Sequence, residues 1–453
     1  MLNLVYLLAT ALFIIGIKLM SAPGTAKKGN LFSAGAMLLA IITVLCDRQI
    51  LDYTWIAIAL TSGTVLGAIA AYRISITAMP QLIAILNGFG GGASLLVGAA
   101  IYSYHQDLNS FTAVAVLISI IIGTITLIGS FIAFGKLGGL ISQQAINICG
   151  QKILFFLLNI LLVGTCVWCL MQPVIPMYGI AIIIVISCLL GCITVLPIGG
   201  ADMPIVISLF NSYSGLAACA SGFAIQNVLL IVCGAIVAAT GFVLTRIMCK
   251  AINRSLSNIV FSSLKTSSAN AATSTATQPV QTMSARDAFY MLEAAQSVVI
   301  VPGYGLAVSQ AQHAVKELTE YLIKNDTTVE FAIHPVAGRM PGHMDVLLAE
   351  ANVPYDQLIA MDQINPRLDT IDVAIVIGAN DTVNLAAKEV PGSPIYGMPI
   401  IEVSQAKQVL VIKRSMAAGF SGMANPLFHK ANTAMLFGDA KAVLQELTAE
   451  FRT

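Results

Sequence analysis

The amino-acid sequence predicts a polytopic α-helical membrane domain of about nine spans, followed by an α/β domain with a Rossmann-like, doubly wound parallel sheet. Composition is the first support: 57% of the 453 residues are hydrophobic and only 10% are charged, whereas soluble domains carry about 25% charge. Charge distribution is the second. Residues 1–284 hold 11 Lys/Arg and 4 Asp/Glu, and residues 285–453 hold 12 Lys/Arg and 18 Asp/Glu. An apolar half therefore precedes an acidic half, and no basic excess in the second half indicates a nucleic-acid partner.

Nine apolar stretches of the first half can each cross about 30 Å of hydrocarbon as a helix of roughly 17–25 residues. The first has no basic segment before it and no clear cleavage site after it, so we interpret it as a span and not as a signal peptide. The second is short. The stretches cover residues 2–20, 31–46, 51–72, 80–102, 111–134, 153–171, 176–197, 203–223 and 226–249.

Loop charges predict the orientation of these spans. One set of ends and loops carries Lys18, Lys27, Lys28, Arg73, Lys136, Lys152, Arg246, Lys250 and Arg254. The opposite set carries only Arg48, with Asp47, Asp52 and Asp107. Because cytoplasmic loops are enriched in Lys and Arg, we expect the N-terminus outside and the second half in the cytoplasm. Residues 254–284 are rich in Ser, Thr and Ala, which predicts a flexible linker between a membrane domain (1–253) and a cytoplasmic domain (285–453).

The cysteines do not indicate a metal site. All nine lie between Cys46 and Cys249, inside apolar runs, where Cys serves as a small packing residue. Cys166 and Cys169 have zinc-like spacing, but no second pair and no His lies near them in the sequence. We therefore expect no metal there.

Strands and helices alternate in the second half. Runs rich in β-branched residues cover 297–301, 329–334, 372–378, 409–412 and 433–438, with amphipathic stretches such as 307–325 between them. Buried strands alternating with amphipathic helices favour a parallel, doubly wound sheet.

The stretch "SVVIVPGYGLAVSQAQ" (297–312) resembles a dinucleotide-binding fingerprint. Gly303 allows a tight turn, and Gly305 lets the backbone approach a pyrophosphate at a helix N-terminus. Val308 stands where a third glycine is usual. The alternative is a glycine turn without a ligand.

The strand ends favour NADP over NAD. An NAD site uses a carboxylate at the end of the second strand, but here that strand ends in His334 and Pro335, and Glu330 lies near its start. Lys413, Arg414 and Ser415 follow a later strand, where two cations and a hydroxyl suit a 2′-phosphate. They can also be an ordinary solvated strand end. If they bind the phosphate, the cofactor lies reversed relative to the usual arrangement.

The chain closely resembles the β subunit of the proton-translocating NAD(P) transhydrogenase over its whole length. The motifs that carry this resemblance are "GGADMPIVISLFNSYSG" (199–215), "PGYGLAVSQAQ" (302–312), "HPVAGRMPGHMDVLLAEA" (334–351), "VIGANDTVN" (376–384), "GMPIIEV" (397–403), "KRSMAAGF" (413–420) and "FGDAK" (437–441).

The resemblance implies NADP(H) bound in the reversed orientation, and a partner α subunit that carries NAD(H). It also implies a hetero-oligomer with two copies of each subunit, in the cell inner (plasma) membrane. NADP contacts are implied at Tyr304, Val336, Ala337, Gly338, Arg339, Met340, Pro341, Gly378, Ala379, Asn380, Asp381, Thr382, Gly397, Met398, Lys413, Arg414, Ser415, Gly419, Phe420, Asp439 and Ala440.

Two of these residues have alternative interpretations. Asp381 can sense the cofactor through its pKa, or it can cap the following helix. Arg339 can pair with a phosphate or lie on the surface. Phe420 departs from the family pattern, in which Tyr is common, so a polar role is doubtful there while a packing role is not.

The membrane half should then move protons through polar groups that face a wet path. On the family motif, the candidates are Asp202, Asn211 and Ser214, while Asn159 is better explained as helix packing. Some relatives have His where this chain has Asn87, and the only His before the cytoplasmic domain is His105, in an external loop. Asn cannot carry a proton by titration. Either water carries the proton at Asn87, or the partner supplies a titrating His.

Two other classes of protein fit the sequence less well. A channel or transporter with a redox-sensing dinucleotide domain should show a selectivity-filter loop, and none is visible. A membrane-anchored dehydrogenase would need a substrate domain, for which no residues remain. We therefore expect hydride transfer from NADH on the partner to NADP⁺ on this chain, coupled to inward proton flow. No acid-base catalyst is needed in this chain, because the cofactors carry the chemistry.

Overall fold

The computed structural model describes residues 2–20, 23–46, 53–104, 109–146, 150–172, 174–257, 280–340, 342–391, 393, 395–417, 419 and 421–452. The charged residues Asp47, Arg48, Asp52 and Asp107, together with His105, Pro341 and Phe420, lie outside this set, as do residues 258–279 of the predicted linker. The chain divides into two compact units, one formed by Met1–Ile198 and Val206–Thr245 and the other by Gly199–Ile205 and Arg246–Thr453.

The apolar half is helical, which confirms the predicted fold class for this part. Eight helices of the described residues are long and apolar enough to cross a membrane, and the apolar part of α1 is slightly shorter. The helices are α1 (Leu2–Met20), α2 (Pro23–Leu45), α3 (Thr54–Arg73), α4 (Met79–Tyr104), α5 (Ser110–Leu137), α6 (Gln151–Met171), α7 (Met177–Val195), α8 (Met203–Ala224) and α9 (Val228–Ala251).

The start of α2 differs from the prediction. The apolar run begins at residue 31, but the helix begins at Pro23 and includes Lys27 and Lys28, whose side chains are exposed. Hydrophobicity shows where a helix crosses lipid, and a helix can continue past that point with polar residues in water. The predicted short second span is therefore the apolar part of a longer helix.

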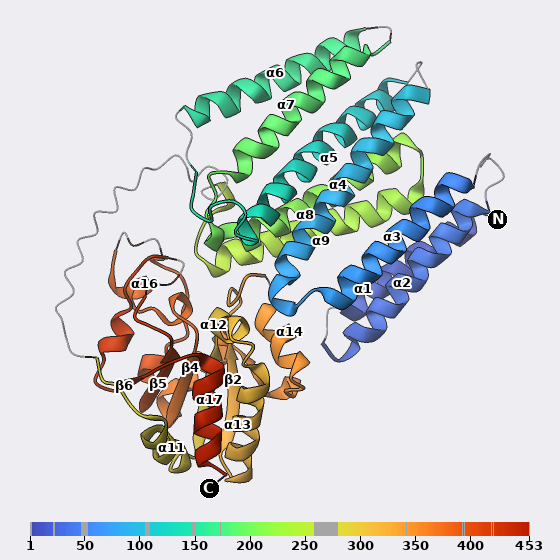
Figure 1. Ribbon diagram of the computed structural model, residues 1–453. Helices are drawn as coiled ribbons and strands as arrows, with labels where there is room; N and C mark the ends of the chain where they lie inside the picture. The colour runs from blue at the N-terminus through green and yellow to red at the C-terminus, as the bar shows by residue number, and fades with distance from the viewer. Residues whose placement is uncertain are drawn as a thin grey trace. The chain divides into compact units, whose positions relative to one another are not determined.

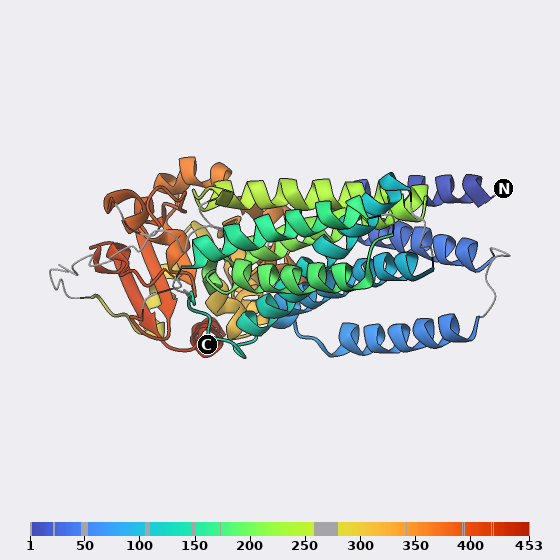
Figure 2. The same cartoon turned by 90° about the horizontal axis from the view of Figure 1, so that it is seen from above.

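Small residues let the helices of the first unit pack closely. A Cβ added to Gly91 of α4 would lie 2.7 Å from the carbonyl oxygen of Gly123 in α5, and one added to Gly215 of α8 would lie 2.5 Å from the backbone nitrogen of Ala238 in α9. Close approach of backbones at small residues is the usual basis of helix packing in membranes. Figure 2 shows these helices running side by side.

The second unit contains a six-stranded, fully parallel sheet in the order β3-β2-β1-β4-β5-β6. Its strands are β1 (Ser297–Pro302), β2 (Thr328–Ile333), β3 (Leu358–Ala360), β4 (Val373–Ile377), β5 (Gln408–Lys413) and β6 (Thr433–Phe437). This order confirms the doubly wound class, in which dinucleotides bind where the winding reverses, here between β1 and β4. The prediction missed β3. Before the first strand, Thr282 forms a parallel bridge with Met435 of β6.

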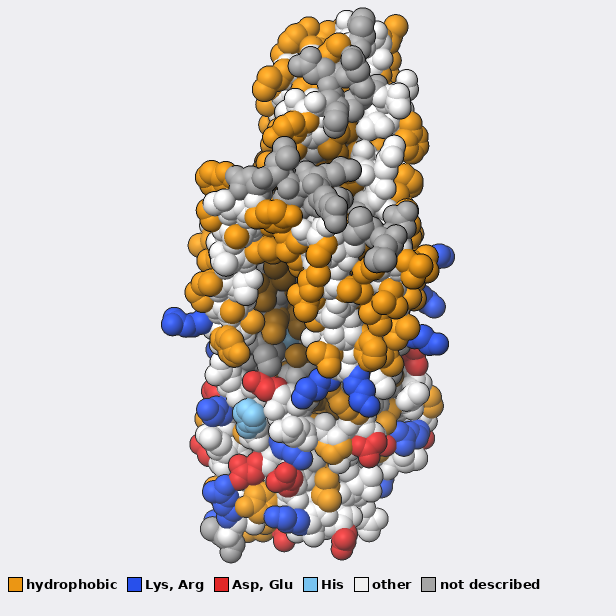
Figure 3. All heavy atoms as spheres, turned by 90° about the vertical axis from the view of Figure 1, so that its right-hand side faces the viewer, with side chains coloured by type: hydrophobic (Ala, Val, Ile, Leu, Met, Phe, Trp, Pro, Cys, Tyr) orange, Lys and Arg blue, Asp and Glu red, His pale blue; other side chains and the backbone are white. Residues whose placement is uncertain are grey.

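Helices cover both faces of the sheet (Figure 1). One face carries α11 (Ala285–Glu293), α13 (Gln312–Lys324) and α17 (Ala440–Glu450), and α17 contacts both of the others. The other packs Val299, Val376 and Val411 against Ile364 of α15 (Met361–Ile364) and Val383. The remaining helices are α12 (Tyr304–Val308), α14 (His343–Glu350) and α16 (Ala386–Glu389). Figure 3 shows the charged side chains gathered on this unit and hydrophobic side chains over the membrane helices.

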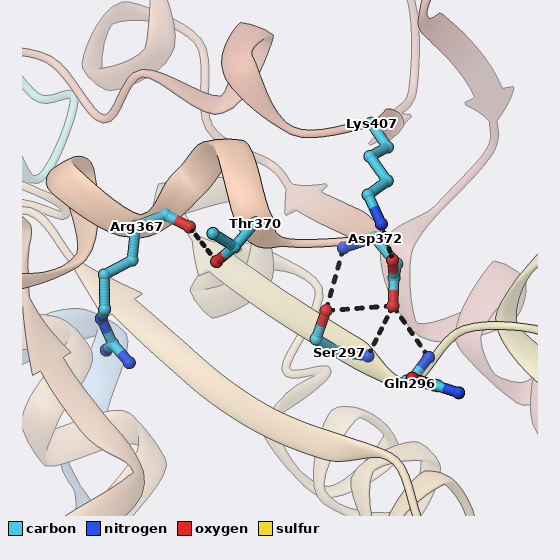
Figure 4. Close-up of polar contacts among 6 residues, drawn as sticks. All are labelled: Gln296, Ser297, Arg367, Thr370, Asp372 and Lys407. Carbon is cyan, nitrogen blue, oxygen red and sulfur yellow. Dashed lines mark hydrogen bonds and ion pairs between the residues drawn. The ribbon is translucent and has the colours of Figure 1, made fainter.

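The Asp372 carboxylate links the amino-terminal ends of β1 and β4 (Figure 4). Asp372 Oδ2 accepts hydrogen bonds from the backbone N–H groups of Gln296 and Ser297 at 2.9 and 3.0 Å, and Oδ1 accepts one from Lys407 Nζ at 2.7 Å. These bonds hold the pKa of Asp372 at about 2, with the Lys407 bond the largest cause. The loops that carry the predicted cofactor residues lie at the opposite, carboxyl-terminal edge of the sheet.

Candidate functional site

The first two glycines of the fingerprint lie where the sheet reverses its winding. Gly303 N–H donates to Ile377 O, and Gly305 N–H donates to Gly378 O, both at 2.9 Å. A Cβ on Gly303 would lie 2.4 Å from Ala379 Cα, and one on Gly305 would lie 2.6 Å from Gly378 Cα. These glycines are therefore needed for the contact between two backbone turns, whether or not a pyrophosphate also approaches them. Val308 ends α12 with its side chain exposed.

Four predicted residues and one unpredicted residue meet beyond β4 and β5. Asp381 accepts hydrogen bonds from Asn380 Nδ2 at 3.1 Å and from Ser421, through the backbone N–H at 3.0 Å and the hydroxyl at 2.6 Å. Lys413 Nζ donates to Asn380 Oδ1 at 3.2 Å. A Cβ on Gly419 would lie 2.7 Å from both Asn380 Nδ2 and Asp381 Oδ1. The strand ends thus form one polar cluster.

The Lys413 ammonium contacts several groups in this cluster. Its ammonium also donates to the Ala417 carbonyl at 2.5 Å and lies 4.9 Å from the centre of the Phe428 ring. Burial lowers the pKa of Lys413, and Asp381 partly opposes that change. Arg414 and Ser415 are exposed. The adjacent cations therefore differ: Lys413 is built into the cluster, and Arg414 points to solvent.

A second group joins the fingerprint turn to the loop after β2. The Arg339 guanidinium lies over the Tyr304 ring at 4.4 Å, and the Tyr304 ring meets the His343 ring edge to face at 6.2 Å. His343 Nδ1 accepts from the Arg339 backbone N–H at 3.0 Å. Burial, with a smaller contribution from Arg339, lowers the pKa of His343 to about 4, so this ring is neutral at physiological pH. Arg339 is therefore held by its cation–π contact with Tyr304 and by its backbone hydrogen bond to His343.

His334 joins that loop to a third predicted segment. Its Nε2 lies 2.8 Å from Pro399 O, and its Nδ1 accepts from the Val336 N–H at 3.2 Å. The ring is buried, and burial lowers its pKa. Pro399 directly follows Gly397 and Met398. His334 thus ties the loop that begins at Val336, and continues through Ala337, Gly338 and Met340, to the Gly397–Met398 turn.

The loop after β6 is fixed by a helix cap. Asp439 accepts from Lys441 N–H at 3.1 Å, as the N-cap of α17, and from the Ser309 hydroxyl at 2.9 Å. These hydrogen bonds, that from Ser309 first, lower the pKa of Asp439. Ala440 is buried at the first position of the helix. The carboxylate therefore has a structural task in addition to its predicted cofactor contact.

The described residues fit a polar dinucleotide at this edge. The buried Thr382 hydroxyl has no hydrogen-bond partner among them, and neither does His343 Nε2, which must carry the ring proton because Nδ1 accepts one. Buried polar atoms left unsatisfied call for an additional partner. Glu330, near the start of β2, forms an ion pair with Arg367 at 3.0 Å.

Polar groups of the membrane helices make contacts across and within helices. Asn87 is buried, and its Nδ2 donates to the Ile207 carbonyl of α8 at 3.1 Å. Ser214 donates to Asn211 O at 2.8 Å within α8, and Asn159 donates to Phe155 O at 2.8 Å within α6. Asn87 is therefore a link between α4 and α8, while Asn159 bonds only locally in the described contacts.

Ser130 was not predicted and lies close to Gly88, the residue after Asn87. Its buried hydroxyl has no hydrogen-bond partner among the described residues. Ser130 Cβ lies 3.3 Å from where a Cβ of Gly88 would be, so α5 places this hydroxyl beside the residue that follows Asn87. Nothing in the sequence distinguished Ser130 from the many other Ser and Thr residues of the spans.

Asp202 forms an ion pair just before α8. Its Oδ2 lies 2.9 Å from Arg254 Nη1, and 14% of its side chain is exposed. Burial raises the pKa of Asp202, and Arg254 opposes that change. Desolvation and the paired Arg254 thus shift the pKa of this carboxylate in opposite directions.

Several residues of the candidate site were missed because their role depends on partners distant in sequence. Ser309, His334 and His343 lie inside the quoted motifs (302–312 and 334–351), but the sequence assigned none of them a contact. Ser421 lies just after the motif 413–420. Each acquires its role from a bond to a predicted residue, and sequence spacing does not show such bonds.

Comparison with known proteins agrees with the motifs. The chain matches the family model "NAD(P) transhydrogenase beta subunit" over residues 2–450. It is 44% identical over 452 residues to the NAD(P) transhydrogenase subunit beta of Rhodospirillum rubrum, covering 98% of this chain and 97% of that protein, and the same values hold for the sequence from a named strain of that organism. The match includes both the membrane helices and the sheet unit, and the chain therefore belongs to the NAD(P) transhydrogenase beta subunit family.

Proposed function

We propose that this chain is the NADP(H)-binding, proton-translocating subunit of a transhydrogenase. The reaction is hydride transfer from NADH, held by an α subunit, to NADP⁺ held here, coupled to inward proton flow. The observation that carries this proposal is the continuous family match over residues 2–450, which spans the apolar helices and the parallel sheet together. A family of soluble dehydrogenases would match this chain only over the parallel-sheet unit.

Residues at the carboxyl edge of the sheet are proposed to hold NADP(H). Bound there, the cofactor supplies the hydride chemistry itself. The Gly303–Gly305 turn and the Gly378–Thr382 loop surround the switch point, and Lys413, Arg414 and Ser415 are proposed to bind the 2′-phosphate. Support comes from the end of β2, where His334 and Pro335 stand in place of a carboxylate, while Glu330 lies nearer the start of that strand and is paired with Arg367. Pro341 and Phe420 belong to the same proposal on the family motif alone.

Asp202, Asn211, Ser214 and Asn87 are proposed to line the proton path. Asp202 titrates, because it is the only carboxylate in this set. Asn87 is proposed to hold a water in the path, although its bond to Ile207 O also fits simple helix packing. The alternative is that the partner supplies a titrating His near this position.

Coupling is proposed to act through binding. The two nicotinamide couples have the same ring chemistry, so the proton gradient must supply the driving force through different affinities for NADP⁺ and NADPH. Asp381 and Asn380 are suited to sense this difference, because they connect the loop after β4 to the loop after β5.

The complex is proposed to contain two copies of each subunit in the inner (plasma) membrane, with the N-terminus outside and the sheet unit in the cytoplasm. A reporter fused after Asn253 should be cytoplasmic, and one fused near Asn109 should be external. The reverse pattern would contradict the proposed orientation.

The proposed function is tested by comparing membranes that contain this chain with and without an α subunit. Membranes that contain this chain and an α subunit should form NADPH from NADH and NADP⁺, and membranes with either subunit alone should not. Calorimetry on the detergent-solubilised chain should show much tighter binding of NADP(H) than of NAD(H). Equal affinity for the two dinucleotides would remove NADP from the proposal.

A further inference from the structure

A phenylalanine interrupts the polar contacts that α8 makes with α4 inside the first unit. Ile207, Phe210 and Ser214 are three and four residues apart, so they lie on one face of α8. The Ile207 carbonyl accepts the Asn87 amide at 3.1 Å, and Ser214 Cβ lies 3.6 Å from where a Cβ of Gly90 would be. Along this face, Phe210 therefore lies between the contacts of Asn87 and Ser214, two residues of the proposed proton path.

The Phe210 ring rests against the backbone of α5. Only 1% of the residue is exposed, and a Cβ added to Gly129 would lie 2.3 Å from the Cζ atom of the ring. Any side chain at Gly129 would therefore displace the ring. The Tyr213 ring, one turn further along α8, meets the Phe210 ring edge to face at 5.9 Å. A glycine of the neighbouring helix and an aromatic ring of its own helix thus hold Phe210 in place.

α7 packs against the same turn of α5. A Cβ added to Gly191 of α7 would lie 3.1 Å from the Ile125 carbonyl oxygen and 3.4 Å from the Gly129 backbone nitrogen. Backbones that approach this closely at small residues leave little room for movement. The surface on which the Phe210 ring rests is therefore rigid.

Buried hydroxyl groups also lie near this face of α8. The Ser130 hydroxyl, directly after Gly129, has no hydrogen-bond partner among the described residues. Further along the same face of α8, the Ser221 hydroxyl lies 2.7 Å from the Ser119 hydroxyl of α5. Polar groups of this kind are what a buried water needs as partners. The Phe210 ring is therefore an apolar interruption in a row of groups that can hold water.

We propose that Phe210 is the seal of the proton path: its ring, seated on Gly129, separates the Asn87 side from the Ser214 side and blocks protons in the absence of hydride transfer. A hydrophobic constriction blocks conduction by excluding water. A coupled translocator needs such a block, because protons that pass freely discharge the gradient without turnover. This inference rests on the proposed path through Asn87 and Ser214. If the ring only packs α8 against α5, its removal lowers the amount of folded protein and leaves proton permeability unchanged.

The test measures the decay of an imposed pH gradient, without nucleotides, across vesicles that contain the full chain and its α subunit. Phe210→Ala removes the ring. Phe223→Ala is the matched control, because Phe223 lies on the same helix and also meets another ring, that of Phe111, edge to face at 5.8 Å, but is 40% exposed. Decay rates are compared at equal amounts of folded complex, and the NADP affinity of each solubilised chain is measured as well.

We expect Phe210→Ala to raise the proton leak about tenfold or more, since a loss of about 1.4 kcal/mol from the barrier to water entry changes a rate by that factor. Phe210→Leu should leak less than Phe210→Ala, because it keeps more of the apolar volume. Phe223→Ala should be as tight as wild type. NADP affinity should stay within about twofold of wild type, because the change lies in the first unit and the proposed nucleotide loops lie in the second.

A double variant tests whether the leak uses the proposed path. Asn87→Leu replaces the amide by an apolar group of similar size, so Phe210→Ala with Asn87→Leu should leak less than Phe210→Ala alone. An equal leak would show that protons bypass Asn87 and would overturn the proposal, and so would a Phe210→Ala rate equal to that of Phe223→Ala. If Phe210→Ala does not accumulate, Phe210→Val replaces it and is judged by the same two comparisons.

Wild-type vesicles test the proposed function separately. If hydride transfer there moves protons but Phe210→Ala does not leak, only the proposed seal fails. If hydride transfer in wild-type vesicles moves no protons, the proposed function itself fails, and with it the path that Phe210 is inferred to close.

Discussion

The carboxylate of Asp381, after β4, accepts hydrogen bonds from both the backbone N–H and the hydroxyl of Ser421, after β5, at 3.0 and 2.6 Å. This pair closes the loop that contains Lys413, Arg414, Ser415 and Gly419 onto the end of the neighbouring strand. Because most of the proposed 2′-phosphate contacts lie on that loop, its anchor should control how firmly NADP(H) is held.

Ser421→Ala should therefore weaken NADP binding and speed its release. The variant removes one hydrogen bond to a carboxylate, which is worth about 1.5–3 kcal/mol, or about 10- to 150-fold. Stopped-flow measurement of NADPH release from the solubilised chain checks this. Ser404→Ala, in a different loop, is the control. A release rate equal to that of the control would show that the Ser421 bond does not restrain the loop.

Lys413→Ala should lower affinity for NADP much more than for NAD. A charge-assisted contact to the 2′-phosphate is again worth about 1.5–3 kcal/mol, and NAD has no phosphate there. Titration calorimetry with both dinucleotides gives the comparison, and Lys430→Ala, at an exposed lysine outside the proposed site, is the matched control. Equal losses for the two dinucleotides would mean that Lys413 supports only the loop, through Asn380 and Ala417.

Asp372→Asn should destabilise the sheet unit in a pH-dependent way. The pKa of Asp372 is lowered to about 2, so its ionised form stabilises the folded state at neutral pH. That contribution is complete above the ordinary carboxyl pKa of about 4 and is lost as pH falls toward about 2. The difference in urea midpoint between wild type and Asp372→Asn should thus shrink from about pH 5 to about pH 3.

The measurement uses a fragment of residues 280–452, which keeps the pairing of Thr282 with Met435. A fragment that starts at 285 should unfold at lower urea because it lacks this pairing. If the midpoint difference for Asp372→Asn is constant over this pH range, the carboxylate does not stabilise the fold by its charge.

Asn87→Ala should distinguish a water-holding role from helix packing. If Asn87 only links α4 to α8 through Ile207 O, its loss costs about 0.6–2 kcal/mol of stability and leaves proton coupling intact. If it holds a water in the proton path, the folded variant still transfers hydride but translocates protons poorly. We expect the second result. Asn87→His should remain active with an altered pH profile, because His titrates near pH 6.5 before burial lowers that value.

The fold was largely predictable because its signals are local. Length and hydrophobicity define the membrane helices, and β-branched runs define five of the six strands. The missed strand, Leu358–Ala360, has only three residues and lies at the sheet edge, so it offers too little pattern to recognise. The early start of α2 was missed for a related reason, since its first residues are polar.

The candidate site was predictable in its residues but not in its connections. Gly303 was identified as the residue of a tight turn and Gly305 as the place where a cofactor approaches, and the structure adds that the neighbouring turn at Gly378 already requires both. Lys136 was counted as a loop charge, although carbonyls about 60 residues further along the chain enclose it. Such relationships depend on which segments the fold brings together, and local sequence patterns do not contain that information.

The central claim is that hydride transfer by this subunit and its partner is driven by a proton gradient. The most direct measurement is the rate of NADPH formation from NADH and NADP⁺ in energised vesicles that contain both subunits, with and without an uncoupler. The gradient should raise this rate, the uncoupler should abolish the increase, and Asp202→Asn should show little increase at all. A rate that is the same with and without the uncoupler would contradict the account.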